Sequence, residues 1–179
     1  MAMNCKPVPT LDERINDIRM RTAEIVNNDI IPNEGRLWAE RREGESFHER
    51  TAVLELRAEI KEKVKKAGLW APHLPTEYGG MGLDFLAHAY MNEVLAYAIG
   101  AASLFGVVAP NSGNQSILVK YGTEQQKQDW LLPLIDGTME SGFSMTEPHN
   151  PGSDPRSLTT AAVVDGDDFD HCEIGRAHV

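Results

Sequence analysis

The chain has 179 residues, of which 41% are hydrophobic and 25% charged, a composition typical of a globular protein that buries an apolar core. Its formal net charge of −10 excludes the concentrated basic face that nucleic-acid binding requires. Cys5 and Cys172 lie at opposite ends without metal-ligand spacing, and no apolar run reaches the roughly 18 residues of a membrane span. We therefore expect a soluble, cytoplasmic protein with no metal site and neither nucleic acid nor membrane as a partner.

Two amphipathic helices are predicted in the first part of the chain. Thr10 and Glu13 form a Thr-x-x-Glu capping box ahead of an apolar stripe at helical spacing, which Pro32 ends. A second stripe at helical spacing stops at Gly68, and its apolar positions are Val53, Leu56, Ile60 and Val64. The basic run 61–66 lies at the end of this second helix, where the helix dipole favours cations.

Residues 69–82 are predicted to form a loop between helices. The segment contains two prolines, which interrupt a helix, and three glycines, which permit tight turns. A phosphate cradle is the alternative use of such glycines. No Lys-Ser or Lys-Thr pair follows them, as a P-loop would require, so the plain link is favoured.

Asp84 is the predicted N-cap of a third helix, and the apolar and small residues after it predict a buried fourth helical segment. Residues 110–114 break this run and precede another helix. Asn111 and Ser112, which lie at the break, are candidates either for a helix cap or for contact with a substrate.

The sequence predicts helices up to residue 137. Gly122 is the expected stop of the helix after the break, and Thr123 with Gln126 forms a second capping box. The short helix that follows is expected to end at Gly137, with Pro133 bending or ending its last turn.

The period of the apolar pattern then changes from that of a helix to that of a strand. Residues 143–146 predict a strand that Pro148 ends, and residues 158–164 predict a second strand that enters a hairpin. We therefore predict an α+β fold, with a helical N-terminal domain at 1–137 and the start of a β-domain at 138–172.

The loop after Pro148 has turn chemistry. Gly152 can adopt a positive φ, and Ser153 and Asp154 can bond nearby backbone groups. A strand end followed by such a loop suits a flat polar ligand, because unpaired backbone groups can bond the edge of a heteroaromatic ring. An ordinary transition from strand to turn is the alternative reading of these residues.

Four segments, in this order, resemble motifs of the acyl-CoA dehydrogenase family. They are Leu74-Pro-Thr-Glu-Tyr-Gly-Gly-Met-Gly82, Tyr121-Gly-Thr-Glu-Gln-Gln-Lys127, Trp130-Leu-Leu-Pro-Leu-Ile-Asp-Gly137 and Phe143-Ser-Met-Thr-Glu-Pro-His-Asn-Pro-Gly-Ser-Asp154. The resemblance implies FAD as cofactor and a fold of the family type, an all-helical N-terminal domain followed by the first strands of a truncated β-domain. It assigns cofactor binding to Phe143, Ser144, Met145, Thr146, Gly152 and Ser153, and substrate binding to Ser153.

The resemblance also implies an activity for the parent enzyme. Such an enzyme introduces an α,β double bond into an acyl-CoA thioester in fatty acid metabolism, passes electrons to electron-transfer flavoprotein and forms homo-oligomers. The catalytic base is expected in a C-terminal part that this chain lacks, so no catalytic residue is assigned and the chain alone is expected to be inactive. Glu147 is expected to bond nearby backbone at the strand end instead.

Two features set the chain apart from the common family pattern. Its loop from Pro148 to Ser153 is one residue longer than the common spacing and resembles a branch with a longer flavin loop, which leaves the acyl chain length open. Residues 173–179 read like the translation of a sequencing adapter, so we interpret them as a non-native tail on a gene fragment.

Two other functions stay open. An oxidase or monooxygenase of the same superfamily would consume oxygen without an added electron carrier. A non-catalytic helical interaction module would purify colourless and take up no flavin.

Overall fold

The computed structural model describes residues 2–38, 47–143, 145–165 and 168–172, and the chain divides into two compact units. Unit 1 is Met1–Ser141 and unit 2 is Gly142–Val179. Our predicted domain boundary lies near residue 138. The predicted site residue Ser144 and the predicted tail at 173–179 lie outside the described residues.

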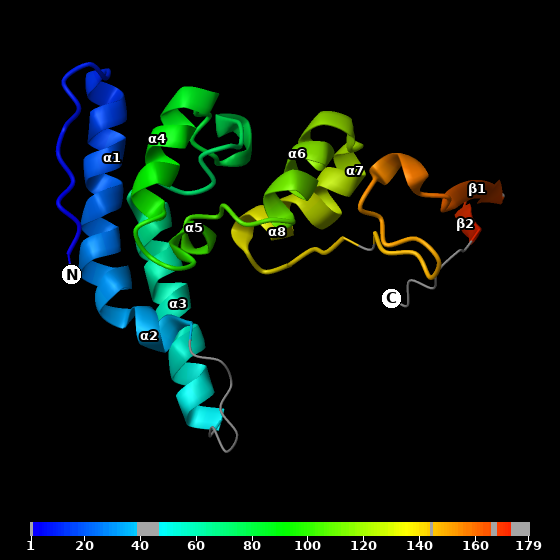
Figure 1. The fold of residues 1–179 in the computed structure, drawn as a ribbon, viewed down its shortest axis with the longest axis horizontal. Helices are drawn as coiled ribbons and strands as arrows, with labels where there is room; N and C mark the ends of the chain where they lie inside the picture. The colour runs from blue at the N-terminus through cyan, green and yellow to red at the C-terminus, as the bar shows by residue number, and fades with distance from the viewer. Residues whose placement is uncertain (1, 39–46, 144, 166–167, 173–179) are drawn as a thin grey trace. The chain divides into compact units, whose positions relative to one another are not determined.

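The described part of unit 1 is built from helices (Figure 1). They are α1 (Glu13–Ile25), α2 (Glu34–Leu37), α3 (Phe47–Lys66), α4 (Phe85–Leu95), α5 (Ala101–Leu104), α6 (Asn111–Tyr121), α7 (Glu124–Gln126) and α8 (Leu132–Asp136). Among them, α1 runs beside α4, and α3 contacts both α2 and α5. No helix in the described ranges combines the length and apolar character that crossing a membrane requires.

Helix α1 begins at a different cap from the predicted one. Its N-cap is Asp12, whose carboxylate accepts a hydrogen bond from the backbone N–H of Arg14 at 2.8 Å. The side chain of Asn16 bonds the backbone N–H and C=O of Val8, at 2.8 and 3.0 Å, and so fixes the turn that contains Thr10. The capping box predicted for Thr10 and Glu13 was therefore wrong.

Three helix ends agree with the sequence. The carboxylate of Asp84 accepts a hydrogen bond from the backbone N–H of Ala87 at 2.8 Å and caps α4. Thr123 and Gln126 form the reciprocal capping box of α7. Gly137 ends α8 with a φ of 81°, a conformation that glycine adopts without steric cost.

We predicted that Pro133 would bend or end the last turn of its helix, but it does not end it, because α8 continues to Asp136. It lies in the first turn of α8, where a missing N–H leaves no hydrogen bond unmade. A π-helical turn, Lys127–Leu131, precedes it, and the backbone N–H of Leu132 donates to the carbonyl oxygen of Lys127. The wider turn accommodates the proline ring without breaking the run of helix.

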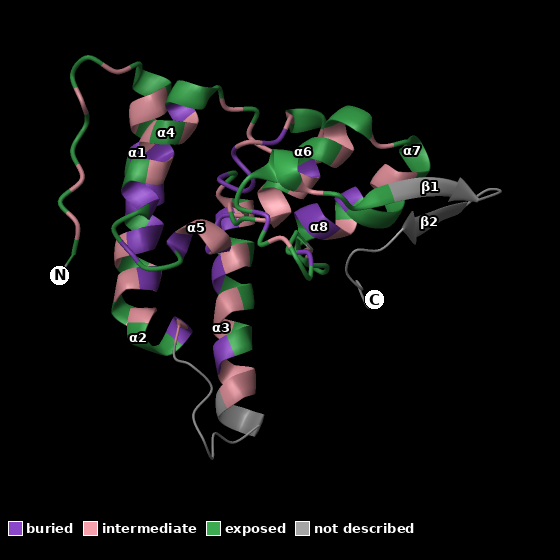
Figure 2. Cartoon of the chain, turned by 45° about the vertical axis from the view of Figure 1, so that its right-hand side comes forward, coloured by how far each residue is buried: buried purple, intermediate pink, exposed green. Residues whose placement is uncertain are grey.

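One apolar core holds unit 1 together, and the buried residues on its helices are purple in Figure 2. Its largest fully buried side chains include Phe105, Ile30, Leu37, Leu69, Leu74, Met91, Leu95, Leu104 and Leu131. They range along the chain from residue 30 to residue 131 and include the segment around α5, which we expected to be buried. Trp38 packs so closely on Gly100 that a Cβ there would lie 2.6 Å from the indole ring.

Unit 2 contains an antiparallel pair of strands, β1 (Ala161–Asp165) and β2 (Asp168–Cys172). In their register Ala161 faces Cys172 and Asp165 faces Asp168, so the pair forms where the sequence predicts a strand and hairpin. The predicted strand at 143–146 was wrong, because its described residues pair with no other strand in the described part of the chain. A strand requires a partner ladder, which local sequence does not supply.

Candidate functional site

The segment predicted to bind flavin contains a tight turn at residues 147–150. The backbone N–H of Glu147 donates to the carbonyl oxygen of Asn150 at 2.9 Å, and the N–H of Asn150 donates back to the carbonyl oxygen of Glu147 at 3.2 Å. Pro148 occupies a position within the turn that needs no donor. The two reciprocal bonds close the turn.

The Glu147 side chain fastens this turn to the residues just before β1. Its buried carboxylate accepts hydrogen bonds from the backbone N–H groups of Thr159 and Thr160, at 2.9 and 2.6 Å. The two threonine hydroxyls donate as well, at 3.1 and 2.6 Å. These bonds, the Thr160 hydroxyl foremost, lower the pKa of Glu147 to about 2. Glu147 bonds backbone as expected, but its partners are residues 159 and 160 rather than neighbours at a strand end.

Sequence reasoning did not identify Thr159 and Thr160 as partners of Glu147. A pair of adjacent threonines just before a predicted strand is the available signal, because each offers a backbone N–H and a hydroxyl to a carboxylate. The separation of twelve or thirteen residues in sequence hides the contact.

Asn150 and Gly152 shape the loop that follows. The Asn150 amide donates to the carbonyl oxygen and the hydroxyl of Ser157, at 2.6 and 2.9 Å, and its own oxygen accepts from the Gly152 N–H at 3.0 Å. Gly152 has a φ of +73°, and a Cβ there would lie 3.2 Å from the carbonyl oxygen of Met145. Both the conformation and the close approach require glycine.

The predicted cofactor residues lie on two sides of this turn. Phe143 and Met145 are 62% and 47% exposed. Thr146 and Ser153 are exposed as well, whereas Gly152 is buried against Met145. Backbone N–H and C=O groups of Phe143, Met145 and Thr146 make no hydrogen bond within the described residues. The assignment of these residues to a cofactor stays a prediction.

In unit 1 the candidate residue Asn111 has a structural contact. Its side-chain oxygen accepts hydrogen bonds from both the N–H and the hydroxyl of Ser141, each at 2.8 Å. The N-cap of α6 is Pro110, which makes no side-chain cap bond, so the cap predicted from Asn111 or Ser112 was wrong. A contact with substrate at these two residues stays a prediction.

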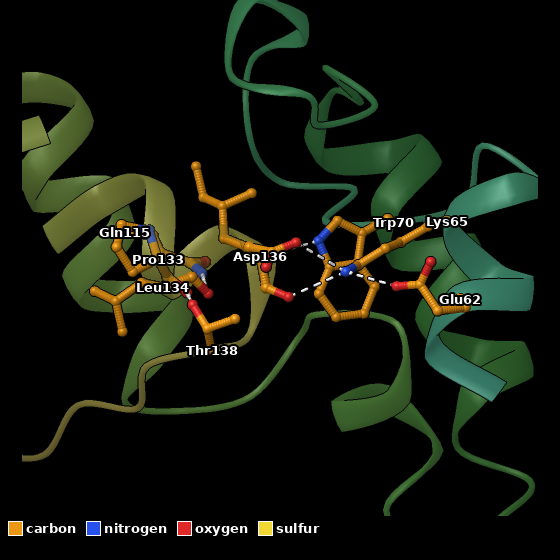
Figure 3. A network of polar contacts seen from close by, with 9 residues as sticks. Glu62, Lys65, Trp70, Gln115, Pro133, Leu134, Asp136 and Thr138 are labelled. Atoms are coloured by element: carbon orange, nitrogen blue, oxygen red, sulfur yellow. Dashed lines mark hydrogen bonds and ion pairs between the residues drawn. The ribbon is translucent and has the colours of Figure 1, made fainter. Parts of the chain in front are cut away.

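A polar network around Trp70 joins α3 to α8 (Figure 3). The indole N–H donates to the carbonyl oxygen of Ile135 at 2.8 Å. The ammonium group of Lys65 bonds the carboxylates of Glu62 and Asp136, each at 3.0 Å, and lies 5.2 Å from the centre of the Trp70 ring. The network spans residues 71 positions apart, which sequence reasoning did not bring together.

His73, on the loop before α4, continues the polar contacts toward α6. One of its ring nitrogens, Nε2, lies 3.0 Å from the side-chain oxygen of Gln115. The Gln115 amide donates to the carbonyl oxygen of Leu134 at 2.9 Å, as Figure 3 shows. His88 of α4 stacks on His73 with ring centres 6.1 Å apart. Burial lowers the pKa of both histidines.

Comparison with known proteins identifies the helical unit. The N-terminal domain of acyl-CoA dehydrogenases matches residues 12–138. "Acyl-CoA dehydrogenase family member 10" of Mus musculus is 38% identical over 125 residues, which are 67% of this chain and 11% of that protein. "Probable acyl-CoA dehydrogenase FadE2" of Mycobacterium tuberculosis is 36% identical over 155 residues, 86% of this chain and 37% of that protein. The chain thus spans a minor part of each relative.

Solved structures agree. A Mycobacterium abscessus protein assigned as an acyl-CoA dehydrogenase superposes with a TM-score of 0.74 at 29% identity, over 89% of this chain and 40% of that one. The acyl-CoA dehydrogenase of Geobacillus kaustophilus gives 0.57 at 26% identity, over 92% of this chain and 39% of that one. The chain therefore belongs to the acyl-CoA dehydrogenase family and corresponds to its N-terminal region.

Proposed function

We propose that the chain is the N-terminal region of a flavin-dependent acyl-CoA dehydrogenase, which converts an acyl-CoA thioester to its α,β-unsaturated product in fatty acid metabolism. The proposal extends to electron-transfer flavoprotein as acceptor and to a homo-oligomeric whole enzyme. It includes the helical unit as the N-terminal domain and the segment from residue 138 as the start of a β-domain.

One observation carries the cofactor assignment. Phe143, Met145 and Thr146 form an exposed segment with unpaired backbone groups, within the described residues, directly before a rigid turn. Such groups can bond the donor and acceptor edge of an isoalloxazine ring, and the exposed aromatic and thioether side chains can contact its face. The residues present thus fit FAD.

The chain's own residues would bind and orient the cofactor. Glu147 holds the turn in place through Thr159 and Thr160, directly after Met145 and Thr146. FAD bound there would supply the hydride acceptor for oxidation of the substrate. Glu147 does not suit the role of the base, since a carboxylate with a pKa of about 2 is a weak proton acceptor.

A hybrid enzyme tests this function. Residues 12–160 of this chain replace the matching part of Mycobacterium tuberculosis FadE2, and FAD content and flavin bleaching by acyl-CoA are measured in hybrid and parent. We expect a yellow hybrid that acyl-CoA bleaches. Thr146→Ala should lower FAD retention, because it removes a hydroxyl from the proposed contact, whereas Thr138→Ala in unit 1 should not.

The alternatives predict other outcomes. A folded hybrid that is colourless beside a flavin-containing parent would favour a helical interaction module. Oxygen consumption without an added carrier would favour an oxidase or monooxygenase.

A further inference from the structure

A small cavity of about 110 Å³ lies within unit 1. Its walls come from α3, from the start of α6 and from the residues after α8. Arg57 and Lys61 of α3 line it together with Asn111 and Glu140. A water molecule takes up roughly 30 Å³ in the liquid, so the space suits a few waters or one small ion.

The two cations in this wall lie one helical turn apart. Arg57 and Lys61 are both half-buried, and the Arg57 guanidinium lies 4.6 Å from the centre of the Trp38 ring. Within the described residues neither side chain makes an ion pair or a hydrogen bond. Like charges at this spacing repel each other, and partly buried cations without acceptors are costly. Burial, foremost, and the nearby Arg57 lower the pKa of Lys61, and the Glu140 carboxylate opposes this shift.

The remaining groups leave the cavity with a positive balance. Among the described residues Glu140 is the one acidic side chain in its wall, and it forms no ion pair with either cation at 4.0 Å or less. Asn111 uses its side-chain oxygen to accept from Ser141, and its amide N–H₂ has no acceptor among the described residues. Two cations and a free amide donor thus line the cavity, against one carboxylate.

We propose that this cavity binds a phosphate-sized oxyanion through Arg57, Lys61 and the Asn111 amide. The planar guanidinium offers two parallel donors to such an ion, and the ammonium group adds a charge-assisted bond. The bound anion would relieve the repulsion between the two cations. Glu140 would oppose its entry. This proposal does not depend on the proposed dehydrogenase function.

Binding of inorganic phosphate to the 179-residue chain tests the proposal. Phosphate replaces chloride at constant ionic strength, while ³¹P line widths and tryptophan fluorescence are recorded, since Trp70 also lines the cavity. We expect saturable binding that Arg57→Gln or Lys61→Gln weakens about tenfold or more. Glu140→Gln should strengthen it. Lys66→Gln is the matched control, because Lys66 lies on the same helix and outside this wall.

Coenzyme A, which carries phosphate groups, is titrated in parallel. If coenzyme A binds more tightly than inorganic phosphate and Lys61→Gln abolishes this binding, the cavity is assigned to a phosphate group of the coenzyme. If coenzyme A binds equally or more weakly, the cavity is assigned to free phosphate. Absence of phosphate binding, or equal binding by wild type and Lys61→Gln, overturns the proposal. If Lys61→Gln lacks the wild-type circular dichroism spectrum, Glu140→Gln decides, and an unchanged affinity there is the contrary result.

Discussion

The Glu147 carboxylate receives four hydrogen bonds from Thr159 and Thr160, and its pKa is lowered to about 2 from the ordinary 4.5. Between these values the folded chain keeps the carboxylate ionised while the unfolded chain takes up a proton. The contribution of Glu147 to stability should therefore be complete above pH 4.5 and be lost as the pH falls through about 2.

The amide resonance of Thr160 measures this titration directly. We expect its chemical shift to change with a midpoint near 2, and Glu147→Gln should remove the transition. A midpoint near 4.5 would show that the carboxylate does not accept these bonds in solution.

Comparing Gly80 with Gly35 shows whether close packing is the reason that position 80 requires glycine. A Cβ on Gly80 would lie 2.3 Å from the carbonyl oxygen of Leu74, whereas a Cβ on Gly35 in α2 would meet nothing within 4 Å. Gly80→Ala should lower the free energy of unfolding by about 1–3 kcal/mol, through overpacking. Gly35→Ala should raise it by up to about 1 kcal/mol, through helix propensity.

Urea unfolding of the two variants beside wild type gives both values. Equal effects of the two substitutions would contradict the packing explanation for Gly80. Close packing explains why residue 80 lies so near Leu74. The phosphate cradle that we considered for the glycines of this loop does not explain it.

At the scale of elements, two stacked histidines link α4 with the loop before it and with α6. His73 Nε2 donates to Gln115, because the Gln115 amide nitrogen already donates to Leu134. The other ring nitrogen of His73 and Nε2 of His88 are buried and have no partner within the described residues. Protonating either ring would therefore bury a positive charge without a hydrogen-bond acceptor among the described residues.

We expect the stability of the chain to fall as the pH drops below the ordinary histidine value of 6.5. Burial lowers both pKa values in the folded state, so the unfolded chain binds more protons in this range and is favoured. Above 6.5 both states are neutral at these residues and the effect vanishes. Urea unfolding as a function of pH measures it.

His88→Phe is the control for this effect, since phenylalanine keeps a ring and cannot take up a proton. The variant should show a weaker loss of stability in the same pH range. Equal losses in wild type and variant would assign the pH dependence to other groups.

Sequence reasoning succeeded for elements whose ends are decided locally. The caps Asp84 and Thr123 each bond the residue three positions ahead, so the motif and the contact coincide. It failed for the strand at 143–146, because strand formation depends on a partner, and for the cap of α1, because Asn16 engages the preceding turn.

The same distinction between local and distant contacts applies to the candidate site. The turn chemistry after Pro148 and the glycine at 152 were readable because each is local. The Thr159 and Thr160 contacts with Glu147 were not, and neither was the convergence of α3 with Asn111, which folding brings together from distant segments. Local motifs therefore located the loop, and only the structure showed what fixes it.

At the scale of the whole molecule, helix α4 and the residues after it carry apolar side chains on the exposed face as well as the buried one. Phe85 is 90% exposed, Leu86 55%, Tyr97 63% and Ile99 72%. We name these four residues the α4 face. Large apolar side chains are usually buried, and exposed apolar surface promotes association.

We expect the 179-residue chain to self-associate through the α4 face, because association removes apolar side chains from water. Size-exclusion chromatography with light scattering should give a mass that rises with protein concentration. The double variant Phe85→Glu, Ile99→Glu should shift the chain toward monomer, since two carboxylates would have to be desolvated in any contact. Ser116→Glu, at an exposed polar position on α6, adds charge without touching the α4 face and should leave the wild-type behaviour unchanged. A wild-type chain that stays monomeric at every concentration would show that the exposed side chains of this face do not drive association.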